Sequence, residues 1–512
     1  MFLDGRSLPD NSFFHADLVI IGAGAAGLTI AGTLANSHLS IILIESGGLE
    51  YDETNQNLNE GESIGLPYAD LTYNRLRFFG GTTNHWGGWC RPLDACDFSP
   101  RDGHKYSGWP VDHAKLLPYY RSAQRIVEAG PYHYDDTTAV ERLVGGKLAL
   151  KGDELTLGMY QYSPPTRFGD AYHAVIAHAR NIKTLLHTNV IEIETTDYAN
   201  TVTGLRVGCL NGRRHKVHAT TYVLAAGGIE NARLLLASNT KQEVGLGNRR
   251  DLVGRFFMEH PHIVPARLLL TPREKHVLNF MKDAHKDGIH GRPCFRPSER
   301  LVAAGGLNAL LILSLHLEFG SDGRPLTPDH PDEENDEEER ILRAAVSRLG
   351  SLSDGDDWNG EPVVEALVEV ACEQSPNPLS RVTLAGPRDA LDIPRVSLDW
   401  RMDQTDLDAL RQTLVSFGAF MGRNRLGYVR LQSADRSLWP GPIGYGNHHM
   451  GTTRMARDTA NGVVDEHGRV HELDNLYVAG SSVFPTGGAA NPTLTIVALA
   501  LRLADRIQEV ML

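Results

Sequence analysis

Asp17-Leu-Val-Ile-Ile-Gly-Ala-Gly-Ala-Ala-Gly27, followed by Ser40-Ile-Ile-Leu-Ile-Glu45, is the stretch of sequence that decides the fold of this chain. The apolar runs 17–21 and 40–44 are typical of two short buried strands, and residues 25–36 carry apolar side chains at helical spacing. A strand, a helix and a second strand of this size form a parallel unit with a right-handed crossover. The chain therefore opens with a nucleotide-binding fold.

Three glycines lie between the first predicted strand and the predicted helix, in the pattern Gly22-x-Gly24-x-x-Gly27. The first glycine permits a tight turn, the second lets a pyrophosphate approach the backbone, and the third lets the helix pack closely on the strand. Glu45, at the end of the second strand, is an acceptor for the hydroxyls of an adenosine ribose. The alternative is a glycine-rich turn with a surface glutamate, and the motif alone does not separate NAD from FAD.

The size, charge and composition of the chain exclude several classes of function. With 512 residues the chain exceeds the size of one hydrophobic core, so we expect at least two domains. A formal net charge of -13 argues against nucleic acid as a partner and favours a neutral or cationic small substrate.

The 5 cysteines are scattered, without metal-site spacing, so we expect no bound metal and free thiols in a reducing cytoplasm. No stretch is typical of an export signal or a transmembrane segment, which favours a cytoplasmic protein.

Later stretches predict further elements of the same kind. Residues 219–227 predict a strand that runs into a glycine turn, and residues 229–237 predict the helix after it. Residues 476–480 predict another strand, and residues 492–512 predict an apolar helix. Residues 74–110 are rich in glycine and aromatic residues and predict a long loop with a functional role. The acidic run 329–340 predicts a solvated loop.

The order and spacing of these motifs resemble the glucose-methanol-choline (GMC) oxidoreductase superfamily. The resemblance rests on the glycine motif, on Asp474-Asn-Leu-Tyr-Val-Ala-Gly480-Ser-Ser, on Asn447-His-His-Met-Gly-Thr452 and on residues 481–495. It implies FAD as the cofactor, because one FAD spans the motifs at both ends of the chain. It also implies an α/β plus β fold with a Rossmann-like, discontinuous FAD-binding domain and a sheet-based substrate domain. The expected limits are 14–110, 180–264 and 446–512 for the FAD-binding domain, the last with the catalytic segment, and 265–445 for the substrate domain.

The resemblance further implies which residues contact FAD. They come from the first glycine motif, the long loop, the middle strands and the C-terminal segment. The expected contacts are Gly22, Gly24, Ala26, Gly27, Glu45, Gly81, Thr82, Asn84, His85, Trp86, Val190, Ala226, Gly480, Ser481, Asn491 and Thr493.

Within the superfamily, Gly80-Gly-Thr-Thr-Asn-His-Trp86 resembles the flavin loop of pyranose oxidases and of related bacterial glycoside oxidases. In those enzymes the histidine of this loop can be bonded covalently to the flavin. This chain departs from the pattern because Asn84 precedes the histidine. We expect His85 near the dimethylbenzene edge of the flavin, with noncovalent binding favoured over covalent attachment.

The catalytic region of the superfamily resembles Asn447–Thr452 and implies that His448 is the catalytic base. Alcohol oxidation must release the hydroxyl proton, and a histidine with a near-neutral pKa can take that proton. His449 is the alternative, but neighbouring side chains in extended backbone point to opposite faces, and the register of the family favours His448. Asn491 precedes Pro492, which predicts a helix cap, and we expect the Asn491 amide also to bind the substrate hydroxyl.

The resemblance implies an FAD-dependent enzyme that oxidises a small-molecule alcohol, at a secondary hydroxyl of a sugar or glycoside, with hydride passing to flavin N5. Dioxygen or another electron acceptor then reoxidises the flavin. A second hypothesis is the flavin subunit of a dehydrogenase that passes electrons to a cytochrome or quinone partner. A third, flavin binding without alcohol chemistry, is disfavoured by the presence of both His448 and Asn491. The sequence is compatible with an oligomer, and His260 and His262 lack further metal ligands, which favours structural or surface roles.

Overall fold

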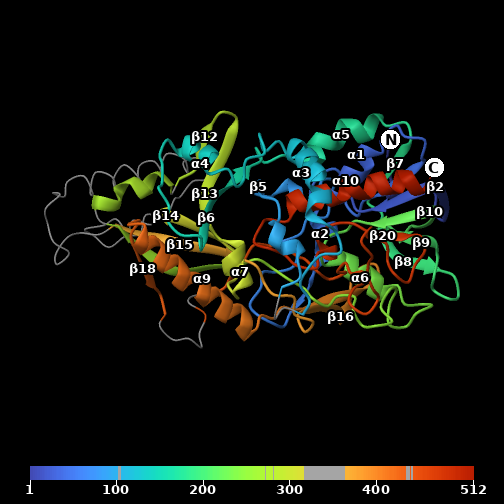
Figure 1. The fold of residues 1–512 in the computed structure, drawn as a ribbon. Coiled ribbons are helices and arrows are strands. Elements are labelled where there is room, and N and C mark those ends of the chain that lie inside the picture. The colour runs from blue at the N-terminus through green and yellow to red at the C-terminus, as the bar shows by residue number, and fades with distance from the viewer. Residues whose placement is uncertain are drawn as a thin grey trace, which may run out of the picture.

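The structure is a computed structural model of the chain, and it describes residues 1–101, 105–270, 272–280, 282–315, 364–433, 439 and 442–511. The acidic run 329–340 lies outside the described residues. Figure 1 shows two lobes, with both chain termini in the lobe on the right. The two lobes are built on separate sheets.

The first sheet has eight strands and forms the nucleotide-binding lobe. Its strands β1, β7, β3, β2, β10 and β20 pair in parallel, and β9 and β8 continue the sheet beyond β10 in antiparallel pairing. Their bounds are Phe2–Asp4 (β1), Ser12–Ile21 (β2), Ile41–Ile44 (β3), Ile182–Leu186 (β7), Asn189–Thr195 (β8), Val202–Gly208 (β9), Arg214–Leu224 (β10) and Leu476–Val478 (β20). The end of β2 from Leu18 onward and the whole of β3 are apolar because these residues are buried in the hydrophobic core.

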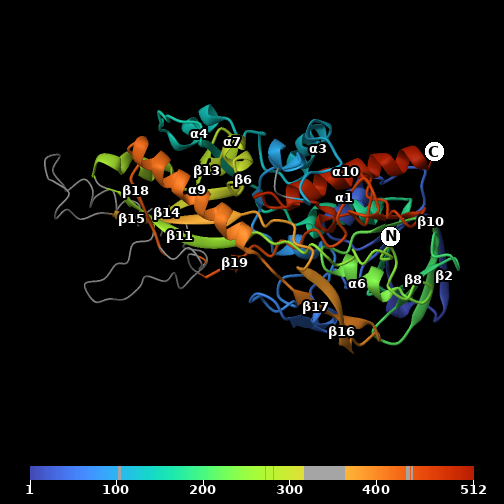
Figure 2. The ribbon, with the colours of Figure 1, turned by 60° about the horizontal axis from the view of Figure 1, so that its bottom comes forward.

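Helices cover the first sheet. On one face α1 (Ala25–Thr33) packs against α5 (Phe168–His178) and α10 (Thr493–Val510), and α3 (His113–Ile126) packs on α10. On the other face α6 (Glu230–Ala237) contacts β8 and a small third sheet. That sheet contains β4 (Gly61–Ser63), β16 (Arg381–Arg388) and β17 (Pro394–Asp399), and Figure 2 shows β16 and β17 below the first lobe.

The second sheet forms the other lobe and has nine strands among the described residues. Its path is β18, β11, β15, β14, β13, β6 and β5, with β12 on β13 and β19 on β11. Their bounds are Trp89–Cys90 (β5), Leu155–Tyr162 (β6), Pro261–Leu270 (β11), Ala284–Lys286 (β12), Ile289–Pro297 (β13), Ala309–Leu315 (β14), Val364–Cys372 (β15), Tyr428–Leu431 (β18) and Gly444–Tyr445 (β19). One face packs on α9 (Gln404–Arg423), and Figure 2 shows this helix crossing the sheet.

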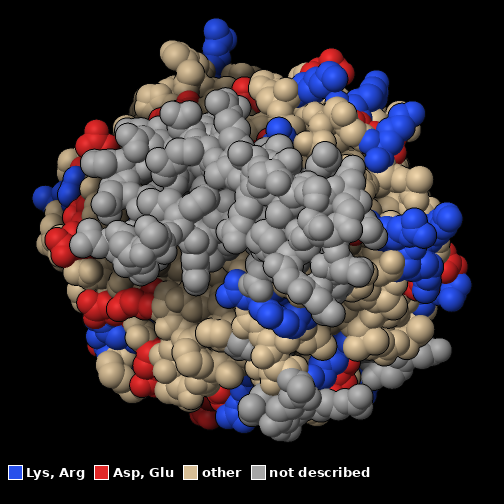
Figure 3. All heavy atoms as spheres, turned by 90° about the vertical axis from the view of Figure 1, so that its left-hand side faces the viewer, with Lys and Arg blue, Asp and Glu red and all other residues tan. Residues whose placement is uncertain are grey.

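Short helices complete the second lobe and the connections. They are α2 (Glu53–Gln56), α4 (Thr137–Val144) and α7 (Glu299–Ala303), with short 3-10 turns at Gly81–Asn84, Ala95–Phe98, Pro272–Phe280 and Ser481–Val483 among others. At the end of the second lobe seen in Figure 3, basic and acidic side chains are interspersed among the described residues. Within the described part of the chain, no helix is both long and apolar enough to cross a lipid bilayer.

The expected α/β plus β fold is confirmed. The predicted strand 17–21 lies within β2, the predicted helix 25–36 starts with α1 but ends after it, and the predicted strand 40–44 matches β3 apart from its first residue. Residues 1–15 show no periodic pattern in the sequence, yet β1 pairs with β7 and β2 begins at Ser12. The expected cap by Asn491 is wrong. Helix α10 begins at Thr493, and the residue at its N-cap is Pro492, whose side chain has no acceptor, so the helix has no side-chain cap.

Candidate active site

One cavity of about 580 Å³ lies where the two lobes meet. It collects the ends of several parallel strands, since Gly22 follows β2, Glu45 follows β3, and Ala226 and Gly480 follow β10 and β20. In open parallel sheets, ligands bind outside the carboxyl ends of the strands. The second sheet lines the cavity through His262 of β11 and Trp89 of β5, so the two lobes share this site.

The glycine motif shapes one wall of the cavity. A Cβ atom on Gly27 would lie 1.9 Å from the Gly22 carbonyl oxygen, so this glycine lets α1 pack on the turn, as the sequence motif predicts. A Cβ atom on Gly24 would meet no atom within 4 Å, because Gly24 borders the cavity. The backbone at Gly24 is therefore open to a ligand, whereas Gly27 is packed and does not line the cavity.

Glu45 is buried at the same wall. Its two carboxylate oxygens accept hydrogen bonds from the backbone N–H groups of Ala23 and Gly47, at 2.9 and 3.0 Å. Burial raises the pKa of Glu45 above its usual value, and the backbone donors and the nearby Arg77 act against that shift. The carboxylate ties the glycine turn to the end of β3.

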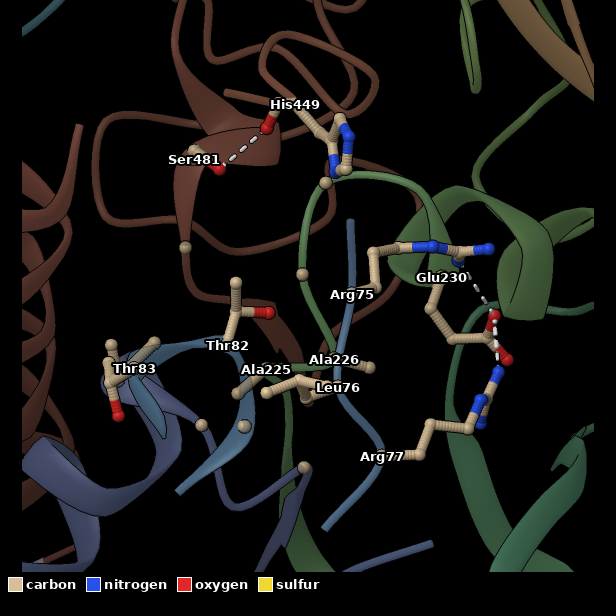
Figure 4. A pocket seen from close by; sticks show the side chains of 18 of the residues that line it. Arg75, Leu76, Arg77, Thr82, Thr83, Ala225, Ala226, Glu230, His449 and Ser481 are labelled. Carbon is tan, nitrogen blue, oxygen red and sulfur yellow. Dashed lines mark hydrogen bonds and ion pairs between the residues drawn. The ribbon is translucent and has the colours of Figure 1, made fainter. Parts of the chain in front are cut away.

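A buried ionic cluster borders the cavity on the side of α6. Figure 4 shows Arg75 and Arg77 reaching toward Glu230, and Glu230 also pairs with Arg233 at 3.1 Å. Arg233 pairs in turn with Asp389 at 2.6 Å. Burial opposes ionisation of Glu230, but the three guanidinium groups outweigh it and lower its pKa to about 2. Three cations face two carboxylates, so the cluster carries an excess of positive charge beside the cavity.

The long loop contributes a second wall. Gly81, Thr82, His85 and Trp86 line the cavity, and Figure 4 shows the side chain of Thr82 close to Ala225 in that view. Asn84 does not line it, because its side-chain amide donates to the Phe79 carbonyl oxygen at 2.9 Å. Burial lowers the pKa of His85, and Arg167 lowers it further. The loop therefore presents a neutral imidazole to the cavity at neutral pH.

His448 and Asn491 meet at the cavity wall. The Asn491 amide nitrogen lies 3.2 Å from Nε2 of His448, and both residues line the cavity. On the other side of the ring, Nδ1 of His448 lies 2.9 Å from Nδ1 of His260. Burial holds the pKa of His448 well below its usual value, and the neighbouring His260, His262 and His449 lower it further.

His449 lines the cavity as well but is packed differently. Its ring lies against Tyr68 and Phe257, with centroids 5.9 Å away in each case, and its Nε2 has no hydrogen-bond partner. Burial lowers the pKa of His449 to about 3. Its carbonyl oxygen accepts from the Ser481 hydroxyl at 2.6 Å, as Figure 4 shows. Of the adjacent histidines, His448 is the one bonded to Asn491.

Three residues of the site were not predicted as such from the sequence. His260 and His262 were assigned structural or surface roles, whereas the structure brings His260 against His448 and places His262 in the cavity wall. Glu259 is buried and accepts from the backbone N–H groups of His448 at 2.7 Å, His260 at 2.8 Å and Gly446 at 3.2 Å. The sequence signal was the compact Glu-His-Pro-His262 segment itself.

The remaining predicted contacts also lie at the cavity. Gly22, Ala26, Val190, Ala226, Gly480, Ser481 and Thr493 line it together with the residues described above. Of the residues expected to contact the cofactor, Gly27 and Asn84 are the ones outside the lining.

Comparison with known proteins identifies the family. Residues 17–367 match the FAD dependent oxidoreductase family, and residues 376–500 match the GMC oxidoreductase family. The chain belongs to the GMC superfamily of FAD-dependent oxidoreductases. It is 26% identical to 6'''-hydroxyparomomycin C oxidase of Streptomyces lividus, over 96% of this chain and 91% of that protein. It is 24% identical to the fructose dehydrogenase large subunit of Gluconobacter japonicus, over 97% of this chain and 98% of that protein.

A solved structure shares the fold of this GMC oxidoreductase. Pyridoxine 4-oxidase from Mesorbium loti superposes with a TM-score of 0.59 at 18% sequence identity, over 96% of this chain and 99% of that chain. FAD is the cofactor of the chain.

The cavity residues fit FAD. Gly24 leaves its wall open at the glycine turn, where backbone N–H groups and the N-terminus of α1 suit a pyrophosphate. The excess positive charge of the Arg75 cluster suits the same anion. Asn74 has both side-chain polar atoms buried without a partner, and Asn447 Oδ1 and His449 Nε2 share that property. Buried polar atoms normally have partners, so these unpartnered atoms at the cavity wall suit a polar ligand.

Proposed function

We propose that this GMC oxidoreductase oxidises a secondary hydroxyl of a sugar or glycoside, with His448 as the base. The observation that carries the proposal is the 3.2 Å contact between His448 Nε2 and the Asn491 amide at the wall of the cavity that fits FAD. The two relatives named above are an oxidase of a hydroxyparomomycin and a dehydrogenase of fructose, which supports a carbohydrate substrate.

Different residues of the chain perform different parts of the proposed alcohol oxidation. FAD, when bound, supplies a two-electron acceptor that takes hydride from the carbinol carbon. His448 accepts the hydroxyl proton at Nε2, because its low pKa keeps the imidazole neutral at neutral pH. Asn491 orients the ring through its amide and is placed to donate to the substrate oxygen.

The proposal extends to the division of the chain and to its cofactor contacts. Residues 14–110, 180–264 and 446–512 would hold FAD, and residues 265–445 would supply the substrate side. The lining of the cavity by Glu45, Val190 and Gly480, one from each of the three stretches proposed to hold FAD, supports this division.

A second candidate function is the flavin subunit of a dehydrogenase that passes electrons to a cytochrome or quinone partner. The match to the fructose dehydrogenase large subunit over 97% of this chain favours it. The two functions share the same reductive half-reaction and differ in the acceptor. Hydrogen peroxide released per substrate oxidised, compared with reduction of an artificial dye without oxygen, separates them.

Anaerobic flavin bleaching with a panel of sugars, glycosides and aromatic alcohols tests the substrate class. The proposal expects bleaching by members of the sugar or glycoside group. Bleaching by aromatic alcohols alone would contradict the carbohydrate assignment. No bleaching by any alcohol would contradict the proposed reaction.

A further inference from the structure

His260 has a defined hydrogen-bonding state. It is buried, with 1% of its surface exposed, and its Nε2 lies 3.2 Å from the Gly487 carbonyl oxygen. A carbonyl oxygen only accepts, so Nε2 of His260 carries the hydrogen and donates it. Burial lowers the pKa of His260 to about 4, so the ring is neutral at neutral pH. In a neutral imidazole with hydrogen on Nε2, Nδ1 is an acceptor.

The state of His260 determines the state of His448. Their Nδ1 atoms lie 2.9 Å apart, and a hydrogen bond between them needs one donor. Because Nδ1 of His260 accepts, Nδ1 of His448 carries the hydrogen. The lone pair of neutral His448 is then on Nε2, where the Asn491 amide donates to it over 3.2 Å. All three contacts agree in direction, from Asn491 to His448 to His260 to Gly487.

We propose that His260 is a positioning residue that holds His448 in the tautomer with hydrogen on Nδ1 and the lone pair on Nε2 toward the cavity. The proposal rests on the function proposed above, in which Nε2 takes the hydroxyl proton. In the opposite tautomer Nε2 would carry a hydrogen, could not accept that proton and would face the Asn491 amide hydrogens.

The same contact serves the protonated ring. When the substrate O–H bond breaks and an N–H bond forms at Nε2 of His448, the ring becomes imidazolium and keeps its hydrogen on Nδ1. That hydrogen still donates to Nδ1 of His260, so neither ring has to turn. The hydride leaves the carbon for the flavin, and the proton stays on His448, which balances the two-electron oxidation.

The backbone around the pair supports this geometry. Glu259 accepts from the backbone N–H groups of both His260 and His448, so one carboxylate sets the spacing of the two chain segments. The antiparallel bridge between Met258 and Met450 joins the same segments. A Cβ atom on Gly487 would lie 2.9 Å from the Met450 methyl carbon and 3.3 Å from Nε2 of His260, so Gly487 packs closely against both side chains.

Two substitutions at His260 separate positioning from packing. In His260→Gln, the amide oxygen can accept from His448 and the amide nitrogen can donate to Gly487. His260→Leu fills a similar volume but can do neither. We expect His260→Gln to slow anaerobic flavin reduction by less than about 10-fold and His260→Leu to slow it by about 100-fold or more, as for a lost general base. FAD content should be unchanged in both, and kcat should fall more than KM rises.

The tautomer of His448 can be measured in the FAD-bound enzyme without substrate. Protein labelled with 15N-histidine gives ring nitrogen signals, and the His448→Asn variant identifies the pair that belongs to His448. We expect a protonated Nδ1 in the wild type and in His260→Gln, and loss of that preference in His260→Leu. A protonated Nε2 in the wild type, or equal impairment in the Gln and Leu variants, would overturn the proposal. A protonated Nδ1 in an enzyme that no alcohol reduces would leave the tautomer assignment standing and remove the proposed function.

Discussion

At the scale of the residue, the site is built from ionisable side chains that burial keeps neutral. His260, His448 and His449 all have pKa values below the usual histidine value because burial disfavours the charged imidazole. At mildly acidic pH these histidines are neutral in the folded protein, whereas the same histidines are protonated in the unfolded chain. The chemistry proposed for the site therefore depends on the same burial that makes the folded state sensitive to acid.

The contribution of His449 to the acid sensitivity of the folded state can be measured. Its pKa is about 3 in the folded protein, against 6.5 in the unfolded chain, so its stabilising contribution is present above pH 6.5 and is lost as the pH falls toward 3. His449→Gln removes the titration and keeps a polar side chain. We expect the stability of the wild type relative to the variant to decrease by about 2 kcal/mol between pH 6.5 and pH 5, at about 1.4 kcal/mol per pH unit. Urea unfolding at the two pH values measures it, and a constant difference would show that His449 takes up its proton in the folded state.

His85 carries a separate prediction. A covalent flavin bond needs the imidazole held at one carbon of the flavin, and Asn84, which precedes it, is turned away to the Phe79 carbonyl. We expect noncovalent binding. Acid precipitation should release the yellow colour into the supernatant as free FAD. Colour that stays in the protein pellet would contradict the prediction, and the His85→Ala protein is the control for a bond through this side chain.

At the scale of the element, the glycines in the turn between β2 and α1 have different roles. Gly27→Ala puts a methyl group against the Gly22 carbonyl, and we expect a loss of stability of about 1 to 3 kcal/mol, as for overpacking. Gly24→Ala meets no protein atom, so we expect little change in stability without FAD and a reduced FAD content. Thermal unfolding with and without added FAD, and the absorbance ratio of flavin to protein, distinguish the two variants. Equal FAD content in Gly24→Ala and the wild type would contradict the cofactor assignment of this wall.

The same turn shows what sequence patterns could predict. The strand, helix and second strand followed from local apolar spacing, and the glycine roles followed from the needs of a tight turn and close packing. The edge strand β1 was missed because three residues are too few to show a period. Asn491 was assigned to a helix cap by its neighbour Pro492, but its amide bonds His448, a contact that local spacing does not reveal.

The contact between His260 and His448 could not be predicted from the sequence for a similar reason. The residues are 188 positions apart and meet because Met258 and Met450 form a bridge and β19 pairs with β11. Arg75, Arg77 and Glu230 also meet only through tertiary packing. The domain limits stay a prediction.

At the scale of the whole molecule, a buried ionic group joins the two lobes close to the cavity. Arg101 pairs with Asp97, 3.1 Å away, and with both oxygens of Glu373, which follows β15 of the second sheet. Asp97 also accepts from the Asn308 amide at 2.9 Å, and its backbone oxygen accepts from the Thr486 hydroxyl at 3.2 Å. This group therefore connects the long loop, the second sheet and the segment that carries Asn491.

Arg101→Met should destabilise the molecule strongly. The substitution leaves the carboxylates of Asp97 and Glu373 buried without their cation, and breaking a buried pair in this way costs about 3 to 5 kcal/mol. The matched control is Arg300→Met, which removes an exposed pair with Asp153 and should change stability by about 1 kcal/mol or less. Chemical unfolding measures both. Similar small effects for the two variants would show that the Arg101 group does not hold the lobes together.

The central claim is that His448 takes the hydroxyl proton while hydride leaves the substrate carbon for FAD. The most direct test is the rate of anaerobic flavin reduction by a reactive sugar or glycoside, measured by rapid mixing for the wild type, His448→Ala and His449→Ala. We expect His448→Ala to retain FAD and to be slower by about 100-fold or more, as for loss of a general base, with a much smaller effect of His449→Ala. A large effect of His449→Ala together with a near wild-type rate for His448→Ala would contradict the claim.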